Sequence, residues 1–169
     1  ALDYHITLDE SGRGEAKLAV TYTHTGQGPI PECSQYDFTV YAEGGPYLDL
    51  AENCYWNYLR IYVPEGSQII SATAHQTPGD FMRTGQPVNL ASNSFTEQPG
   101  FTTFDNFFVV PYGQNVISEY HYSLPIITIS DGNNANQYQL TIYKQASSVP
   151  EPASVSVTLP EGAKFIEAS

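Results

Sequence analysis

Four residues of one short segment could bind a ligand by ring stacking and hydrogen bonding. Trp56, Tyr58, Arg60 and Tyr62 occupy every second position, and residues two apart on a β-strand project from the same face of a sheet. If that face is open, three aromatic rings and a guanidinium would form a platform on which sugar rings can stack. Carbohydrate binding is therefore the leading hypothesis for a ligand site.

The same side chains could instead form a second buried layer. Contiguous exposed aromatic patches are rare on soluble domains, and Arg60 could cover a neighbouring ring through a cation–π contact. This interpretation is the more usual one for such a pattern. The sequence leaves both open.

Residues suited to catalysis are sparse. Glu119 and His121 lie two apart on an expected strand and could share a proton, although a solvated polar face explains them more simply. A glycosidase needs two carboxylates about 5 to 10 Å apart, and no spacing among the 18 acidic residues recommends a pair. Motifs typical of nucleophilic serines, P-loops, zinc proteases and dinucleotide sites are not found. We expect a non-catalytic protein without a cofactor.

Two turns carry oxygen-bearing side chains that could ligate Ca²⁺: Asp9, Glu10 and Glu15 in one, and Asp131, Asn133 and Asn134 in the other. Neither turn matches the twelve-residue calcium loop between two helices. The same residue types are ordinary turn formers. The sequence therefore favours plain turns, and we expect no metal site.

The composition indicates an all-β chain. Among the 169 residues, 13% are aromatic and only 14% are charged, which favours strands and loops over helices. The formal net charge of -12 opposes binding to nucleic acid and to anionic membranes. No apolar run approaches the roughly eighteen residues of a membrane-spanning helix. We expect neither a nucleic-acid partner nor direct membrane insertion by this chain.

Alternation of apolar and polar residues predicts the strands. They cover residues 2–8, 17–25, 54–63, 101–112, 116–124, 137–145 and 154–159. We expect the first two to form a hairpin, and the strands on either side of Tyr112–Asn115 to form another. Segment 54–63 should be a central strand ended by the turn at Pro64, and segment 77–99 should be mostly loop. Strands and turns at this spacing predict one β-sandwich domain over residues 1–169, with Greek-key-like connections and long loops.

Cys33 and Cys54 are the only cysteines. They show neither a C-x-x-C pattern nor a Cys/His cluster, so a disulfide is the leading interpretation and two unpaired thiols are the alternative. A disulfide closing a loop of this size would stabilise the fold by roughly 3 kcal/mol on the chain-entropy model, and it would indicate an oxidising compartment. Because the chain begins at Ala1, we expect it to be a piece of a longer protein.

Several short motifs resemble a known family. They are Cys54-Tyr55, Tyr58-Leu59-Arg60, Tyr62-Val63-Pro64, Gly66-Ser67, Tyr122-Ser123-Leu124-Pro125, Tyr138, Leu140, Tyr143-Lys144-Gln145, Leu159-Pro160 and Gly162, together with Asp3-Tyr4, Gly12, Thr21-Tyr22 and His24 near the start. On these residues most of the chain is similar to the C-terminal region of the bacterial domain-of-unknown-function 4012 proteins. The resemblance implies the extracytoplasmic, cell-surface end of a large envelope protein, attached through an upstream membrane segment. Such proteins tend to accompany surface-polysaccharide functions, and the family has no established activity or catalytic residues.

Together these observations predict a non-catalytic, extracytoplasmic binding or assembly module of a bacterial cell envelope. Surface polysaccharide is the leading partner, with Trp56, Tyr58 and Tyr62 as stacking residues and Arg60 as a polar contact. One alternative is a purely structural scaffold that binds protein, such as the upstream domain of the same protein. A second alternative is a carbohydrate hydrolase that uses Glu119 and His121.

Overall fold

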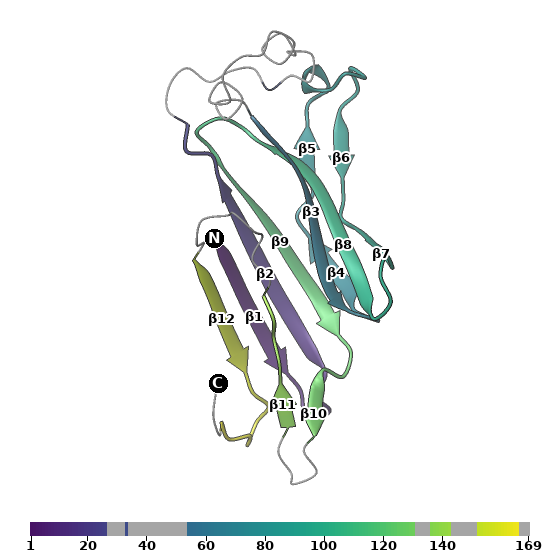
Figure 1. The fold of residues 1–169 in the computed structure, drawn as a ribbon, viewed down its shortest axis with the longest axis vertical. Coiled ribbons are helices and arrows are strands. Elements are labelled where there is room, and N and C mark those ends of the chain that lie inside the picture. Colours follow the sequence, from purple (N-terminus) through teal and green to yellow (C-terminus); the bar gives the residue numbers. More distant parts are fainter. Residues whose placement is uncertain (27–32, 34–53, 131–135, 143–151, 166–169) are drawn as a thin grey trace.

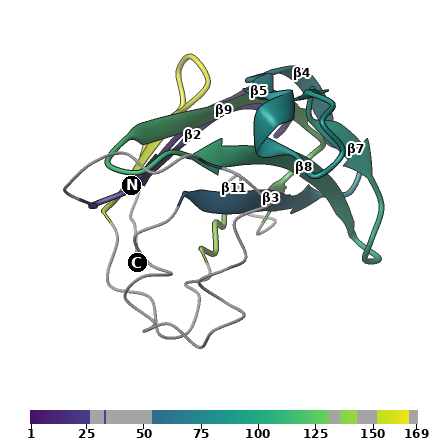
Figure 2. The ribbon, with the colours of Figure 1, turned by 90° about the horizontal axis from the view of Figure 1, so that it is seen from above.

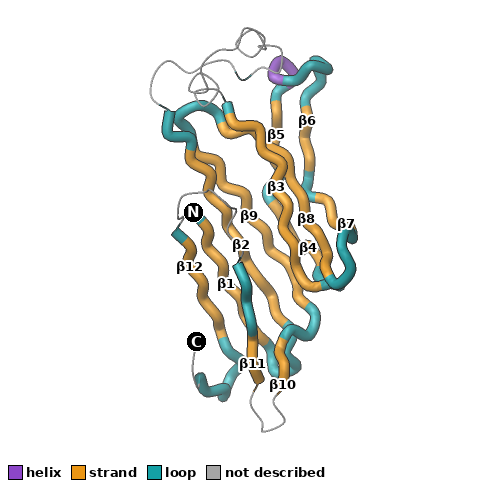
Figure 3. Tube along the Cα trace, viewed as in Figure 1, coloured by secondary structure: helices purple, strands orange, loops and turns teal. Residues whose placement is uncertain are grey.

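The structure is a computed structural model and describes residues 1–26, 33, 54–130, 136–142 and 152–165. Within these ranges the regular structure is β-strand apart from one 3₁₀ turn, η1 (Gly79–Phe81). The all-β prediction is therefore confirmed (Figure 3). None of the described residues belongs to a helix with the length and apolar character needed to cross a membrane.

The larger sheet has five strands in the order β12-β1-β2-β9-β4 (Figure 1). They are β1 (Leu2–Leu8), β2 (Gly14–Thr23), β4 (Gln68–Ala72), β9 (Asn115–Leu124) and β12 (Ala153–Thr158). β1 and β2 form the expected antiparallel hairpin. β12 lies parallel to β1 at the sheet edge, so the two ends of the described chain are joined in one sheet.

The smaller sheet has the order β3-β8-β7. Its strands are β3 (Tyr55–Pro64), β7 (Asn93–Phe95) and β8 (Phe101–Val110), and β3 pairs with β8 from Tyr55 opposite Val110 to Pro64 opposite Phe101. β3 is thus an edge strand of the described sheet, and the prediction of a central strand is wrong. The alternation along one strand indicates which of its faces are apolar, but it does not indicate whether the strand pairs along one edge or along both.

Two short strand pairs flank the sheets, one at each end of the sandwich in Figure 1. β5 (His75–Thr77) pairs with β6 (Val88–Leu90), and β10 (Thr128–Ser130) pairs with β11 (Asn136–Tyr138). Segment 77–99, predicted to be mostly loop, therefore holds β6 and β7. These strands are three residues long, too short for alternation to be detected. The predicted strand 137–145 is shorter in the structure, where β11 ends at Tyr138 and residues 143–145 lie outside the described part.

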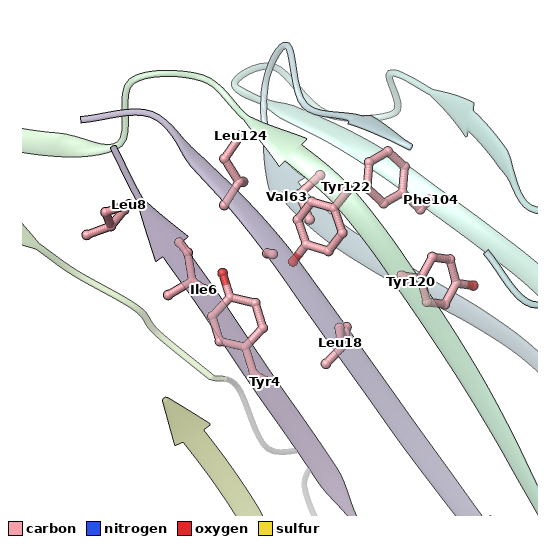
Figure 4. Close-up of a cluster of buried hydrophobic side chains, with 10 residues drawn as sticks. Tyr4, Ile6, Leu8, Leu18, Val63, Phe104, Tyr120, Tyr122 and Leu124 are labelled. Atoms are coloured by element: carbon pink, nitrogen blue, oxygen red, sulfur yellow. The ribbon is translucent and has the colours of Figure 1, made fainter. Parts of the chain in front are cut away.

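The two sheets pack face to face and enclose the hydrophobic core (Figure 2). The core comprises Tyr4, Ile6, Leu8, Ala16, Leu18, Val63, Phe104, Tyr120, Tyr122 and Leu124. Within it Phe104 of β8 meets two tyrosines of β9 across the layers: its ring centroid is 6.4 Å from that of Tyr120 and 5.4 Å from that of Tyr122 (Figure 4). Over the described residues the arrangement is sandwich-like but not closed, since only Val63 and Phe104 of these ten residues come from the smaller sheet.

The connection from β8 to β9 differs from the predicted hairpin. Gln114 N donates to Pro111 O at 3.1 Å, so a tight turn is present, but β8 pairs with β3 and β7 whereas β9 pairs with β2 and β4. The prediction of a second hairpin is therefore wrong. Turn residues indicate that the chain reverses, but they do not determine whether the two strands pair edge to edge or pack across layers. The chain also changes layer between β2 and β3 and between β3 and β4, as in a Greek-key-like sandwich.

The disulfide between Cys33 and Cys54 is present, and both residues are buried. Their Cα atoms are 5.4 Å apart, which is within the usual range for a disulfide. Cys54 directly precedes β3. The disulfide therefore holds the start of this strand against a residue 21 positions earlier in the chain.

Removal of the buried Phe104 ring tests this packing. Phe104 is fully buried, so we expect Phe104→Ala to lower the free energy of unfolding by about 3 to 5 kcal/mol. The matched control is Phe101→Ala on the same strand, where the ring is 43% exposed, and we expect it to cost less than about 1 kcal/mol. Urea unfolding monitored by circular dichroism measures both values. Equal losses in the two variants would contradict the proposed layer arrangement.

Candidate functional site

The outward face of the smaller sheet carries a continuous group of side chains that we call the aromatic platform. It comprises Trp56, Tyr58, Arg60 and Tyr62 of β3, Phe101, Thr103, Asp105 and Phe107 of β8, and Asn93 and Phe95 of β7. Paired residues of antiparallel strands lie on the same face of a sheet, so the pairing register places all of these on one side. The four residues predicted from the sequence are therefore brought together.

The β3 side of this face is largely exposed to solvent, whereas Thr103 and Asp105 of β8 are buried. Tyr58 and Tyr62 are 50% and 42% exposed, Arg60 is exposed, and Trp56 is partly buried. Phe101 on the neighbouring strand is exposed as well. Tyr58 and Tyr62 therefore do not lie in a second buried layer. The predicted cation–π contact does form, with the Arg60 guanidinium carbon 5.2 Å from the Tyr58 ring centroid, but it forms on the surface.

Aromatic side chains gather at two positions along the platform. Near the start of β3, the ring centroids of Trp56 and Phe107 are 6.0 Å apart. Toward its end, the rings of Tyr62 and Phe101 meet edge to face with centroids 6.3 Å apart. Thr103 is fully buried and is paired with Tyr62 on one side and with a second phenylalanine, Phe95, on the other. Each group thus presents ring surface supported by other rings.

Glu97 fixes the polar centre of the platform. Its Oε1 atom accepts a hydrogen bond from Arg60 Nη1 at 2.8 Å, and its Oε2 atom accepts one from the Tyr62 hydroxyl at 2.9 Å. The Tyr62 hydroxyl and then the Glu97 carboxylate raise the pKa of Arg60. One carboxylate therefore holds both a ring and the cation in position, which lowers the entropy cost of binding a ligand there.

Asp105 is a buried carboxylate beneath the same face, only 4% exposed. Its Oδ1 atom accepts hydrogen bonds from the backbone N and from Nδ2 of Asn93, each at 3.0 Å, and its Oδ2 atom accepts one from the Tyr58 hydroxyl. This last hydrogen bond is the main reason that the pKa of Tyr58 is raised. Asp105 therefore links all three strands of the smaller sheet.

Sequence reasoning did not find Glu97, Asp105 or Asn93. Glu97 and Asn93 lie in the segment predicted to be mostly loop, where no alternation marked them. Asp105 did leave a signal, because it interrupts an otherwise aromatic strand at a position facing the same side as Phe101 and Phe107. A carboxylate in such a strand is expected to be paired.

The candidate catalytic pair lies on the opposite side of the molecule, on the outward face of the larger sheet. There a groove is lined by Asp3, His5, Lys17, Glu119 and His121, among others. His121 Nε2 lies 3.2 Å from Oε2 of Glu15 on the neighbouring strand, so its hydrogen bond is to this carboxylate instead of Glu119. The Glu15 side chain is 64% exposed. The arrangement is an exposed hydrogen bond between neighbouring strands on the outward face of the larger sheet.

The first candidate calcium turn connects β1 to β2 in the hairpin. Asp9 Oδ1 accepts hydrogen bonds from Ser11 N, Ser11 Oγ and Arg13 N at 2.8, 2.7 and 3.0 Å, and these bonds lower the pKa of Asp9. This oxygen therefore accepts its hydrogen bonds from within the turn. The second candidate turn, Asp131 with Asn133 and Asn134, lies outside the described residues. Over the described ranges, no group of three His, Cys, Asp or Glu side chains is arranged to hold a metal ion.

Comparisons with known proteins add no functional information. The sequence matches no family model, and it matches none of the curated proteins. The candidate site is therefore argued from its own geometry.

Asp105 provides a test of the hydrogen-bond network. We expect Asp105→Asn to lower the pKa of Tyr58, because the carboxylate that disfavours the tyrosinate is lost, and to destabilise the fold by about 1 to 3 kcal/mol. NMR titration of ¹³Cζ-labelled tyrosines and denaturant unfolding measure the two effects. Asp3→Asn, an exposed site on the other sheet, is the control and should change neither. An unchanged Tyr58 titration in Asp105→Asn would disprove the coupling.

Proposed function

We propose that this domain is a non-catalytic module that binds carbohydrate on the aromatic platform. The observation that carries the proposal is the exposure of Tyr58 and Tyr62 on a face whose polar groups are already positioned by Glu97. Sugar-binding surfaces combine ring faces, which stack on the apolar side of a pyranose, with fixed hydrogen-bonding groups around them. Trp56, Tyr58 and Tyr62 would stack, and Arg60 would donate hydrogen bonds.

We propose an extracytoplasmic location for the module, on a bacterial cell envelope whose surface polysaccharide supplies the ligand. The disulfide between Cys33 and Cys54 supports an oxidising compartment. The envelope and the polysaccharide come from the resemblance described above, so they are part of the proposal. The net charge of -12 fits a partner that is not a phosphate-rich polymer.

A protein-binding scaffold is the second candidate function. Val155 and Val157 of β12 are paired with the core residues Tyr4 and Ile6, so they face the inner side of the larger sheet, yet they are 45% and 41% exposed. Apolar side chains left exposed at a sheet edge are typical of surfaces that another chain covers. This observation favours an assembly role at β12, away from the aromatic platform.

A polysaccharide and glycan-array binding screen tests the carbohydrate proposal. We expect the wild-type domain to bind at least one sugar class and Trp56→Ala to lose that binding, because the variant lacks one ring face of the platform. Tyr55→Ala is the matched control, since this neighbouring ring is 52% exposed but projects from the opposite face of β3. Circular dichroism must first show that both variants are folded.

Three results would count against this proposal. If no glycan binds, or if both variants lose binding equally, the platform is not a sugar site and the scaffold role is preferred. Glycan cleavage by the wild type that persists in Trp56→Ala and disappears in Glu119→Gln would favour the hydrolase alternative instead.

A further inference from the structure

The two ring groups of the platform are too far apart for one sugar to use both. The first group is Trp56 with Phe107, and the second is Tyr62 with Phe101 and Phe95. Trp56 and Tyr62 are six residues apart on one strand, a separation of roughly 20 Å at the rise of a β-strand. A single pyranose ring covers only one group. A glycan chain lying along the strand would reach both.

The surface between the ring groups carries a third ring and a cation. Tyr58 and Arg60 lie there, and both are exposed. The Tyr58 ring offers a further stacking surface, and the guanidinium donors of Arg60 that Glu97 does not use can hydrogen-bond to the hydroxyls of a sugar unit held between the two ring groups. A chain that stacks at both ends would thus meet hydrogen-bonding groups in its middle.

The charges of the platform oppose an acidic chain. Arg60 is the one cation among the platform residues, and the Glu97 carboxylate already neutralises it at 2.8 Å. The buried Asp105 carboxylate adds a further negative charge beneath the same face. The whole chain carries a formal net charge of -12, so uronate or phosphate groups would meet a repulsive potential here.

We propose that the aromatic platform binds an extended, uncharged glycan chain that spans both ring groups. This inference rests on the proposed function, because it takes the platform to be a carbohydrate site. It adds that chain length and the absence of acidic groups determine which carbohydrates bind. A monosaccharide can occupy one ring group only, and an acidic polysaccharide is excluded by charge.

Calorimetric titration with defined oligosaccharides tests this inference. The probes are neutral gluco-, galacto- and manno-oligosaccharides as mono-, tri- and hexasaccharides, with oligogalacturonates as acidic counterparts of equal length. We expect a neutral hexasaccharide to bind at least about tenfold more tightly than its monosaccharide. Trp56→Ala and Tyr62→Ala should each weaken hexasaccharide binding roughly tenfold, the effect of losing one stacked ring. Tyr55→Ala should leave binding unchanged, and the acidic chains should not bind.

The possible failures are distinguishable. If neutral chains bind with no dependence on length, or if only one of the two ring variants weakens binding, the spanning geometry is wrong while the carbohydrate function stands. If galacturonate chains bind as tightly as neutral chains, the charge argument is wrong, again with the function intact. If none of these carbohydrates binds, this inference and the proposed function fall together.

Discussion

Ten consecutive residue pairs join β3 to β8, and both the core and the aromatic platform depend on this pairing. Because side chains alternate across a strand, the same two strands direct Val63 and Phe104 into the core and direct Tyr62 and Asp105 to the outer face. A slip of one residue in this register would exchange the two sets. The same register therefore fixes the positions of the platform side chains and of the core side chains beneath them.

Hydrogen bonding then shapes the outer face. Asp105 is buried and must be paired, and its partners come from β3 on one side and β7 on the other. Glu97, which follows β7 in the chain, reaches Arg60 and Tyr62 on β3. Strand β7 is short, but polar groups on it and directly after it hold side chains of β8 and β3 in place.

The exposure of the outer face of β3 is what makes the platform available to a ligand. The same strand covered on both faces would bury its aromatic residues as part of a core. Here the larger sheet covers only the inner face of β3, and Tyr58 and Tyr62 remain exposed on the other. The disulfide at Cys54 secures the strand at its start, and the turn in which Ser67 N donates to Pro64 O at 3.1 Å ends it. Both constraints limit fraying of an edge strand.

Local patterns in the sequence determined the all-β class, the β1–β2 hairpin, the Cys33–Cys54 disulfide and the grouping of Trp56 with Tyr62 on one face. Each of these follows from residue types and from the period of two along a strand. Only the tertiary structure decided that β8 and β9 lie in different layers and that β3 lies at the edge of the sheet formed by the described strands. The tertiary structure also decided that Glu97 and Asp105 lie at the site. The physical reason is that layer, exposure and long-range hydrogen bonding depend on which distant strands pair, and a strand's own alternation carries no information about its neighbours.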